Sequence, residues 1–125
     1  MPLYDHSEKL SVEQSLSPAT YTASANGAGV SLGGHEAAMI VFDVGTITDG
    51  AHTPTVEKSV DNASSWTALT DADLVGSLSD LASGTVQEVG FVGVATDLRT
   101  VTTVSGATSG GVYSATVVLG EKGNL

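Results

Sequence analysis

The stretch from Glu36 to Thr48, EAAMIVFDVGTIT, has the strongest strand pattern in the sequence. Alternate positions form one apolar set, made of Ala38, Ile40, Phe42 and Val44. The positions between them form a second set, made of Ala37, Met39, Val41 and Asp43. Because successive side chains of a strand point to opposite faces, the first set predicts a face packed on a core. The second set is also largely apolar, which indicates a central strand with both sides partly covered.

Shorter strand patterns lie on both sides of this stretch, separated by turn signals. We expect them at residues 18–25, 30–32, 55–61, 66–69, 85–94, 98–104 and 112–119. Thr70-Asp71-Ala72-Asp73 has the pattern of a helix N-terminus and predicts one short helix after it. The glycine-bearing stretch 105–111 predicts a hairpin loop between the last two strands. The pattern predicts an all-β fold, a single β-sandwich or jelly-roll-like domain of about seven or eight short antiparallel strands over residues 19–125.

Composition supports a β-rich domain and argues against several functions. Fifteen glycines suit tight turns, and 125 residues suit one domain with one core. The formal charge of −10 predicts repulsion from nucleic acids and from anionic membrane surfaces. The absence of cysteine excludes disulfides and cysteine-ligated metal.

Residues 1–18 predict an extended N-terminal arm, because their apolar residues are sparse and follow no period. These residues are Leu3, Tyr4, Leu10, Val12 and Leu16. The arm has two interpretations: a frayed terminus, or a strap that binds a neighbouring subunit through these five side chains. The first ten residues have no basic region followed by an apolar run, so we expect a soluble chain without a cleaved signal.

The sequence predicts neither an enzyme nor a cofactor or metal site. The three histidines, His6, His35 and His52, fall in the arm or in turn-like segments, where solvated side chains are expected. Asp71 and Asp73 lack the glycine and glutamate of a calcium loop. The usual motifs for nucleophilic, zinc-hydrolase and nucleotide chemistry are absent.

The segment from Ser59 to Trp66, SVDNASSW, resembles the Asp-box, a β-hairpin motif of the form Ser-x-Asp-x-Gly-x-Thr-Trp. Ser59, Asp61 and Trp66 match the motif, whereas Ala63 replaces its glycine and Ser65 its threonine. In the motif the aspartate accepts hydrogen bonds from the turn and the tryptophan packs beneath it. The resemblance therefore implies a structural hairpin with a buried Trp66; sugar binding is the alternative.

A second resemblance covers residues 36–120. It rests on the ordered segments 44–54, 61–62, Trp66, 73–76, 104–108 and 117–120. Together they resemble small proteins encoded among the head genes of tailed phages. Many of those proteins have an arginine-rich strand where this chain has Asp97-Leu98-Arg99-Thr100, so no basic surface is implied here.

This resemblance implies a non-enzymatic structural protein of the virion and brings no catalytic residues with it. The leading hypothesis is a capsid decoration, or cement, protein that assembles in the bacterial host cytoplasm and binds the outer surface of an HK97-like head. Its partners would be the major capsid protein and further copies of itself, as a trimer, with neither nucleic acid nor membrane involved. The alternatives are a head-tail joining or tail-associated β-domain, and a carbohydrate-binding module.

Overall fold

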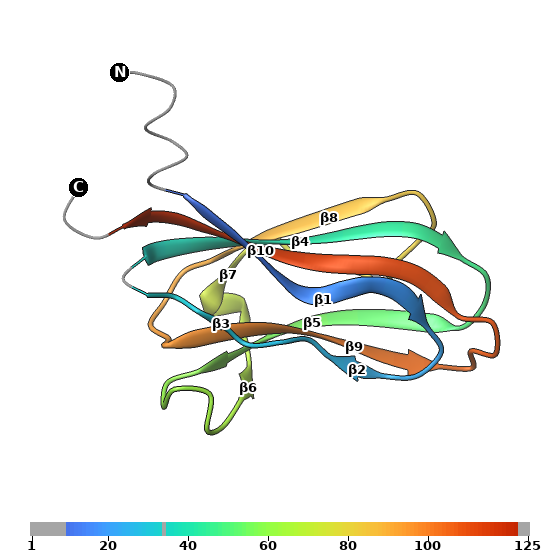
Figure 1. Ribbon diagram of the computed structural model, residues 1–125, viewed down its shortest axis with the longest axis horizontal. Coiled ribbons are helices and arrows are strands. Elements are labelled where there is room, and N and C mark those ends of the chain that lie inside the picture. The colour runs from blue at the N-terminus through green and yellow to red at the C-terminus, as the bar shows by residue number, and fades with distance from the viewer. Residues whose placement is uncertain (1–9, 34, 123–125) are drawn as a thin grey trace, which may run out of the picture.

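The computed structural model describes residues 10–33 and 35–122, which fold into two antiparallel sheets packed face to face (Figure 1). Sheet A has the order β1 (Ser11–Tyr21), β10 (Gly111–Lys122), β4 (His35–Ile47), β8 (Val86–Phe91), β7 (Leu74–Val75). Sheet B has the order β2 (Ala25–Asn26), β9 (Asp97–Ser105), β5 (Ala51–Ser59), β6 (Thr67–Ala68), and β3 (Val30–Ser31) also pairs with β9. The expected all-β sandwich is confirmed.

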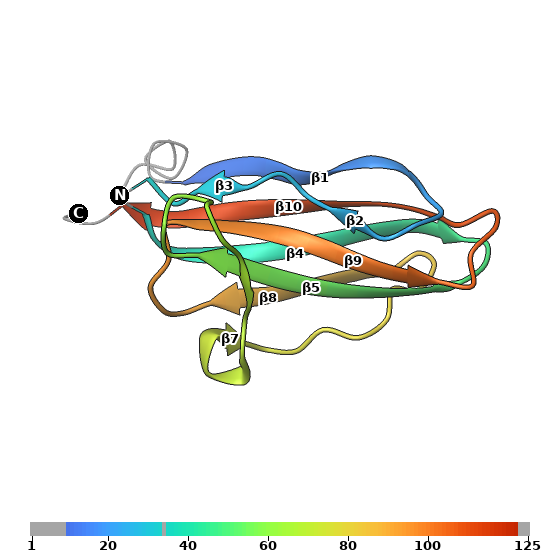
Figure 2. The same ribbon diagram turned by 90° about the horizontal axis from the view of Figure 1, so that it is seen from below.

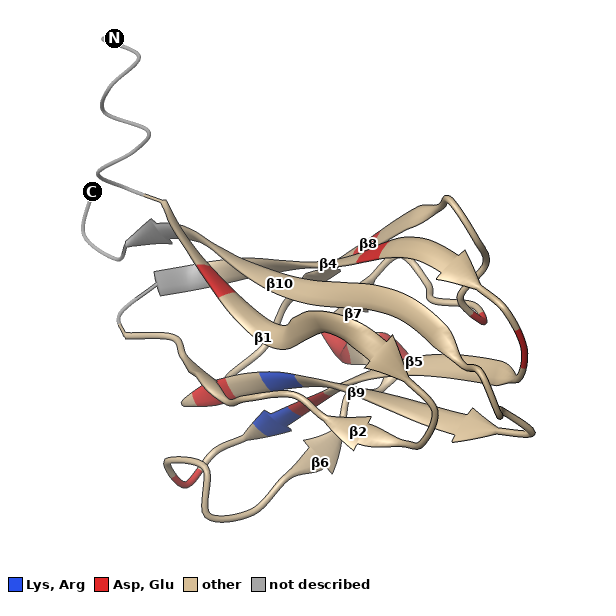
Figure 3. Cartoon of the chain, turned by 45° about the vertical axis from the view of Figure 1, so that its right-hand side comes forward, with Lys and Arg blue, Asp and Glu red and all other residues tan. Residues whose placement is uncertain are grey.

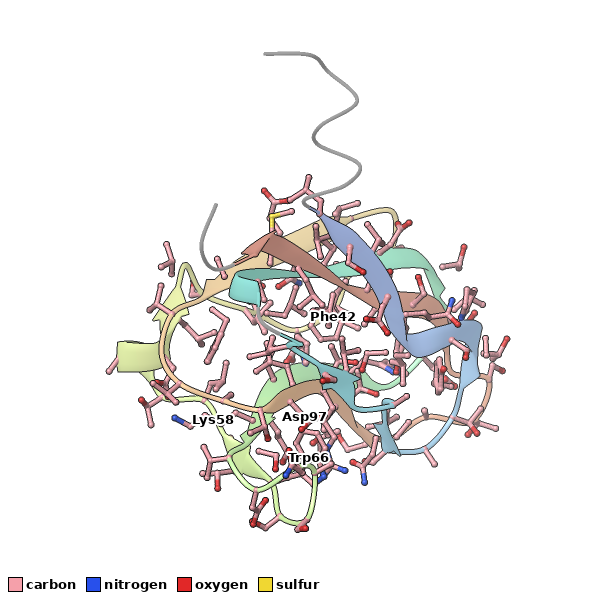
Figure 4. The ribbon with its side chains drawn as sticks, turned by 60° about the vertical axis from the view of Figure 1, so that its left-hand side comes forward. Phe42, Lys58, Trp66 and Asp97 are labelled. Atoms are coloured by element: carbon pink, nitrogen blue, oxygen red, sulfur yellow. The ribbon has the colours of Figure 1, made fainter. Side chains whose placement is uncertain are left out.

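The central position expected for the stretch 36–48 is also confirmed. β4 lies between β10 and β8 in the middle of sheet A. Its inward side chains are all buried: Ala38, Ile40, Phe42 and Val44. Figure 4 shows Phe42 between the two sheets. The main core partners come from β8, β9 and β10: Val89, Phe91, Leu98, Tyr113, Ala115, Val117 and Leu119.

The described chain has more strands than expected and less helix. It contains ten strands instead of seven or eight, because the two-residue strands β2 and β7 were too short to leave a periodic pattern. The expected helix is a single 3-10 turn, η1 (Asp71–Asp73), after which Leu74 and Val75 pair with β8 as β7. Thr70 and Asp73 form a capping box, so the predicted helix N-terminus is present. The helix itself is limited to this one turn. Among the described residues, no helix is long and apolar enough to cross a membrane.

The glycine-bearing stretch 105–111 is not a hairpin loop. β9 belongs to sheet B and β10 to sheet A, so this stretch carries the chain from one sheet to the other. The turn from β4 to β5 makes the reverse crossing at the same end of the sandwich (Figures 1 and 2). The Asp49 carboxylate ties the two crossings together by accepting the backbone N–H groups of Thr108, Ser109 and Gly110, the last at 2.7 Å. Turn composition identified the turn but carried no information about which strands pair.

The expected boundary at residue 18 falls inside β1. Residues 11–18 pair with β10 as the edge strand of sheet A and are therefore part of the sandwich. Two register shifts, between Gln14 and Leu16 and between Leu16 and Ala19, interrupt the alternation of side chains. Such bulges remove the period of two on which strand prediction depends. This is why the segment looks irregular in the sequence.

β1 also closes one side of the sandwich through buried polar contacts. The Ser15 hydroxyl donates to the carbonyl of Ala28 at 2.8 Å and accepts the backbone N–H of Thr100 at 3.0 Å. The backbone N–H of Ala28 donates to the Ser15 carbonyl at 2.6 Å. Sheet A is thereby connected to β9 and to the segment before β3.

Candidate functional site

The hairpin between β5 and β6 is organised by the Asp61 carboxylate. One of its oxygens accepts the hydroxyl of Ser59 at 2.8 Å and the backbone N–H of Ser65 at 3.0 Å. The other accepts the Ser65 hydroxyl at 2.7 Å. The Ser59 hydroxyl oxygen in turn accepts the N–H of Ala63 at 2.8 Å. These bonds satisfy hydrogen-bond donors of the turn from within the hairpin, so Ser59 and Asp61 have a structural role.

Two residues of this hairpin, Asn62 and Ala63, have left-handed backbone conformations, with φ of 58° and 68°. Asparagine tolerates this region, whereas alanine is strained there by about 1–2 kcal/mol. Ala63→Gly should therefore raise the free energy of unfolding by about 0.5–1 kcal/mol, after subtraction of the larger unfolded-state entropy of glycine. Urea denaturation measures this change. Asn62→Gly is the matched control and should change stability little; an equal gain from both, or a loss from Ala63→Gly, would contradict the strain argument.

The structure places Trp66 on the outside of sheet B, and the expectation of a buried staple is wrong. Its side chain is half-buried, and the Arg99 guanidinium carbon lies 4.6 Å from the ring centroid. Arg99 is held by Glu57, with its Nη2 at 2.6 Å from the carboxylate. The far edge of the indole lies against Gly29, where a Cβ would be 3.1 Å away. Figure 4 shows Trp66 on the opposite side of sheet B from Phe42. The hairpin projects outward over the sheet, so its tryptophan cannot reach the core.

His52 is a buried residue of β5, not the solvated turn residue that the sequence indicated. Its Nδ1 lies 2.9 Å from the Tyr113 hydroxyl and its Nε2 lies 3.0 Å from the carbonyl of Asp49. Tyr113 stacks on Tyr21 with ring centroids 4.9 Å apart. Burial raises the pKa of the Tyr113 hydroxyl. His6 and the side chain of His35 lie outside the described residues. Within the described part of the chain, no three histidine, aspartate or glutamate side chains are grouped so as to hold a metal ion.

The five arm residues are not brought together as one binding surface. Leu16 is 3% exposed and belongs to the core of the domain itself. Leu10 and Val12 are exposed at the start of sheet A, with 41% and 66% of their surfaces accessible. Leu3 and Tyr4 lie outside the described residues. Of the expected contact residues, Leu10 and Val12 are thus exposed in the described part of the chain.

Val12 is one member of an apolar row that crosses all five strands of sheet A. The pairing register aligns Val12 of β1, Val118 of β10, Met39 of β4, Gly90 of β8 and Val75 of β7. Because Ala38 and Ile40 point into the core, Met39 between them points outward. No described element covers this side of sheet A (Figure 1). We call these five residues the apolar row.

The neighbouring positions extend this outer face of sheet A. The next row consists of Gln14, Thr116, Val41 and Glu88. The row after it consists of Ser114, Asp43 and Val86. The sequence carried a signal for this surface, namely the apolar second face of the stretch 36–48. Which strands would lie beside it, and in which register, depends on long-range pairing that no local pattern shows.

A pocket of about 230 Å³ opens between β5 and the segment that connects β6 to β7. Its apolar lining residues are Pro54, Val56, Leu69, Leu74 and Leu78, and polar groups provide the larger part of its exposed surface. Asp71 is the one titratable residue in the lining. A single carboxylate provides neither an acid-base pair nor a nucleophile with its base, so this pocket has no arrangement suited to catalysis.

Hydrogen bonds to three aspartate carboxylates should make the domain less stable at low pH. Three backbone N–H donors lower the pKa of Asp49, the Ser65 and Ser59 hydroxyls lower that of Asp61, and the backbone of Thr70 lowers that of Asp73. A carboxylate whose pKa is lower in the folded state contributes stability that is present above its unfolded pKa and lost as the pH falls through the folded pKa. We therefore expect the melting temperature to fall as the pH drops below about 3.8, the ordinary value for aspartate.

Asp49→Asn is the variant that tests this dependence. It lacks one of the three titrations, so its melting temperature should fall less steeply between pH 3.8 and lower pH than that of the wild type. Asp71→Asn, at an exposed position of η1, is the control and should retain the wild-type slope. Identical slopes for all three proteins would show that Asp49 does not contribute.

Comparison with known proteins identifies similar folds. No family model matches the sequence, and no curated protein matches it. Among solved structures, the SPBc2 prophage-derived protein YomS is similar, with a TM-score of 0.57 and 15% identity over 88% of this chain and 91% of that chain. At this identity the likeness shows the fold alone.

Two further structures are similar at lower TM-scores. One is the Clostridium thermocellum endo-1,4-beta-D-xylanase 10B, CBM22-1-GH10 modules complexed with xylohexaose, with a TM-score of 0.42 and 12% identity over 90% of this chain and 28% of that chain. The other is infectious bursal disease virus, Gx strain, with a TM-score of 0.38 and 17% identity over 93% of this chain and 34% of that chain. Scores this low carry no argument about function.

Proposed function

We propose that the chain is a non-enzymatic structural protein of a tailed-phage virion, and specifically a decoration protein that binds the outer surface of an HK97-like head. The observation that carries the proposal is the uncovered outer face of sheet A, with the apolar row across its five strands. The largest exposed apolar patch of a soluble domain is often a functional one, so the apolar row is a candidate site of association.

Two other findings support a phage particle as the place of action. The fold is similar to that of a prophage-derived protein over about nine tenths of both chains. The sequence segments between residues 36 and 120 resemble head-gene proteins of tailed phages. The charge of −10 fits the outer surface better than the interior, because packaged DNA would repel it.

The proposed mechanism is thermodynamic linkage. A protein that binds the expanded, assembled shell and not its separate subunits stabilises the assembled state by mass action. The major capsid protein is the partner in this proposal, and trimers of the chain at three-fold positions would match the symmetry of such a lattice. No bond is made or broken, so the proposal requires no catalytic residue or cofactor.

The alternatives differ in copy number or in the surface they use. A head-tail joining or tail-associated domain uses the same fold in far fewer copies. A carbohydrate-binding module would need a free aromatic face, and the Trp66 ring instead packs against Arg99 and Gly29. The position of Trp66 therefore disfavours the carbohydrate proposal.

Quantitative gel densitometry of purified virions tests the proposal. The phage that encodes the chain should contain it in amounts comparable to the major capsid protein. An amount many times smaller would favour the joining or tail role. Absence of the chain from purified virions would refute the virion proposal altogether.

A further inference from the structure

We infer that the outer face of sheet A docks on a protein surface whose apolar side chains are bordered by lysine or arginine. This inference rests on the proposed function in one respect: the proposed function places the partner surface on the phage shell. The chemistry of the partner follows from the face itself. The face combines the apolar row with an acidic border, and the basic residues whose side chains the structure describes lie in the other sheet.

The apolar character of the face is continuous across the strands. Val118 lies between Val12 and Met39 in the register, and Val75 lies beside Gly90 at the other end. Val12, Met39 and Val75 are 66%, 38% and 60% exposed. A row of this kind, open to water, is a surface that association would stabilise.

The charged side chains that the structure describes on this face are acidic. Asp43 and Glu88 project from β4 and β8, within one or two rows of the apolar row, and both are exposed. Of the basic residues whose side chains the structure describes, Lys58 and Arg99 both lie in sheet B, as the blue segments of Figure 3 show; Lys122 ends β10 in sheet A. The first two are already paired, Lys58 with Asp73 at 3.6 Å and Arg99 with Glu57 at 2.6 Å. A partner that buries this face should therefore provide cations opposite Asp43 and Glu88.

A second copy of this chain fits the face less well. Two copies would bring the carboxylates of Asp43 and Glu88 near their own counterparts, which raises the free energy of association. Five strands, each about 4.8 Å wide, over about seven residues of 3.3 Å each, give a face of roughly 550 Å². A contact that covers this face buries about 1,100 Å² in total whatever the partner, slightly less than the roughly 1,200–2,000 Å² of stable interfaces, so the repulsion between carboxylates is what disfavours a second copy.

The same small area predicts weak binding by a single copy. Binding by several linked copies to repeated sites raises the effective concentration of each one, so a repeating basic and apolar lattice provides the strength that one face lacks. This agrees with a partner that presents many identical sites.

The test uses the full chain and agarose beads of three kinds, bearing hexylamine, butyl or aminoethyl groups. Hexylamine presents a cation with an apolar chain, and the other two present each property alone. Wild-type protein should bind hexylamine beads at least about tenfold more tightly than either other kind. Equal binding to aminoethyl beads would show that net charge alone is responsible and would overturn the inference.

Two variants and two matched controls locate the binding on the face. Met39→Thr combined with Val118→Thr removes apolar surface without changing charge and should weaken hexylamine binding at least about tenfold. Val60→Thr, at an exposed valine of the β5–β6 hairpin, should bind as the wild type does. Glu88→Gln should weaken binding more than Asp97→Asn, which removes the same charge from β9. Equal effects of variant and control would overturn the inference.

Sedimentation equilibrium of the same proteins tests the second copy as occupant. The inference predicts that Met39→Thr with Val118→Thr leaves the oligomeric state unchanged. If the wild-type chain forms an oligomer that this variant does not form, the face mediates self-association. That result would overturn the inference of a basic partner. The bead result does not depend on virions. If purified virions lack the chain but the chain still binds hexylamine beads selectively, the proposed function is refuted. The inferred chemistry of the partner would then still stand.

Discussion

Replacing Phe42 with alanine should lower the free energy of unfolding by about 3–5 kcal/mol, because the ring is fully buried between the sheets. Phe42 lies in the central strand of sheet A, so the cavity would be bounded by strands on both sides and could close little. A loss of this size is a large part of the stability of an ordinary domain. Urea denaturation monitored by circular dichroism measures it.

The control for Phe42→Ala is Met39→Ala on the same strand. Met39 points to the outer face and is 38% exposed, so its truncation should cost less than about 1 kcal/mol. A similar loss for both variants would mean that the outward face of β4 is as buried as the inward face, which would contradict the described sandwich.

Gly110→Ala should destabilise the domain by about 2–5 kcal/mol, the second large effect. Gly110 has a φ of 79°, in the left-handed region, which costs an alanine about 1–2 kcal/mol. A Cβ at this position would also collide with the backbone carbonyl of Tyr21 in β1, adding about 1–3 kcal/mol of strain. The same residue donates its N–H to Asp49 at 2.7 Å, so displacement would also disturb the connection between the two crossings.

Gly106→Ala is the matched control in the same connection. Its φ of 69° imposes the same left-handed strain, but no atom lies within 4 Å of its Cβ position. It should therefore lose about 1–2 kcal/mol. If thermal or urea denaturation gives equal losses in the free energy of unfolding for Gly106→Ala and Gly110→Ala, β1 does not approach this connection as closely as described.

Features with a local cause could be predicted from the sequence. The inward face of β4 follows from strict alternation, and the acceptor role of Asp61 follows from the spacing of the hairpin motif. Thr70 and Asp73 form a capping box at the predicted helix N-terminus, because capping depends on residues three apart. Each of these depends on neighbours in the chain.

The errors have long-range causes. The bulges of β1 concealed a strand whose Leu16 is in the core, and pairing with distant β10 forms that strand. His52 occurs beside turn residues in the sequence, yet Tyr113, sixty-one positions later, helps to bury it. The apolar row could not be assembled either, since its five members come from five strands whose order is set by the complete fold.

The binding face can be tested most directly with empty, expanded heads of the phage that encodes the chain, assembled without it. Wild-type chain and the Val60→Thr control should co-sediment with these heads to saturation. The Met39→Thr, Val118→Thr double variant should remain folded by circular dichroism and bind at least about tenfold more weakly. Unchanged co-sedimentation of the double variant, or failure of the wild-type chain to co-sediment, would contradict attachment to the shell through the outer face of sheet A.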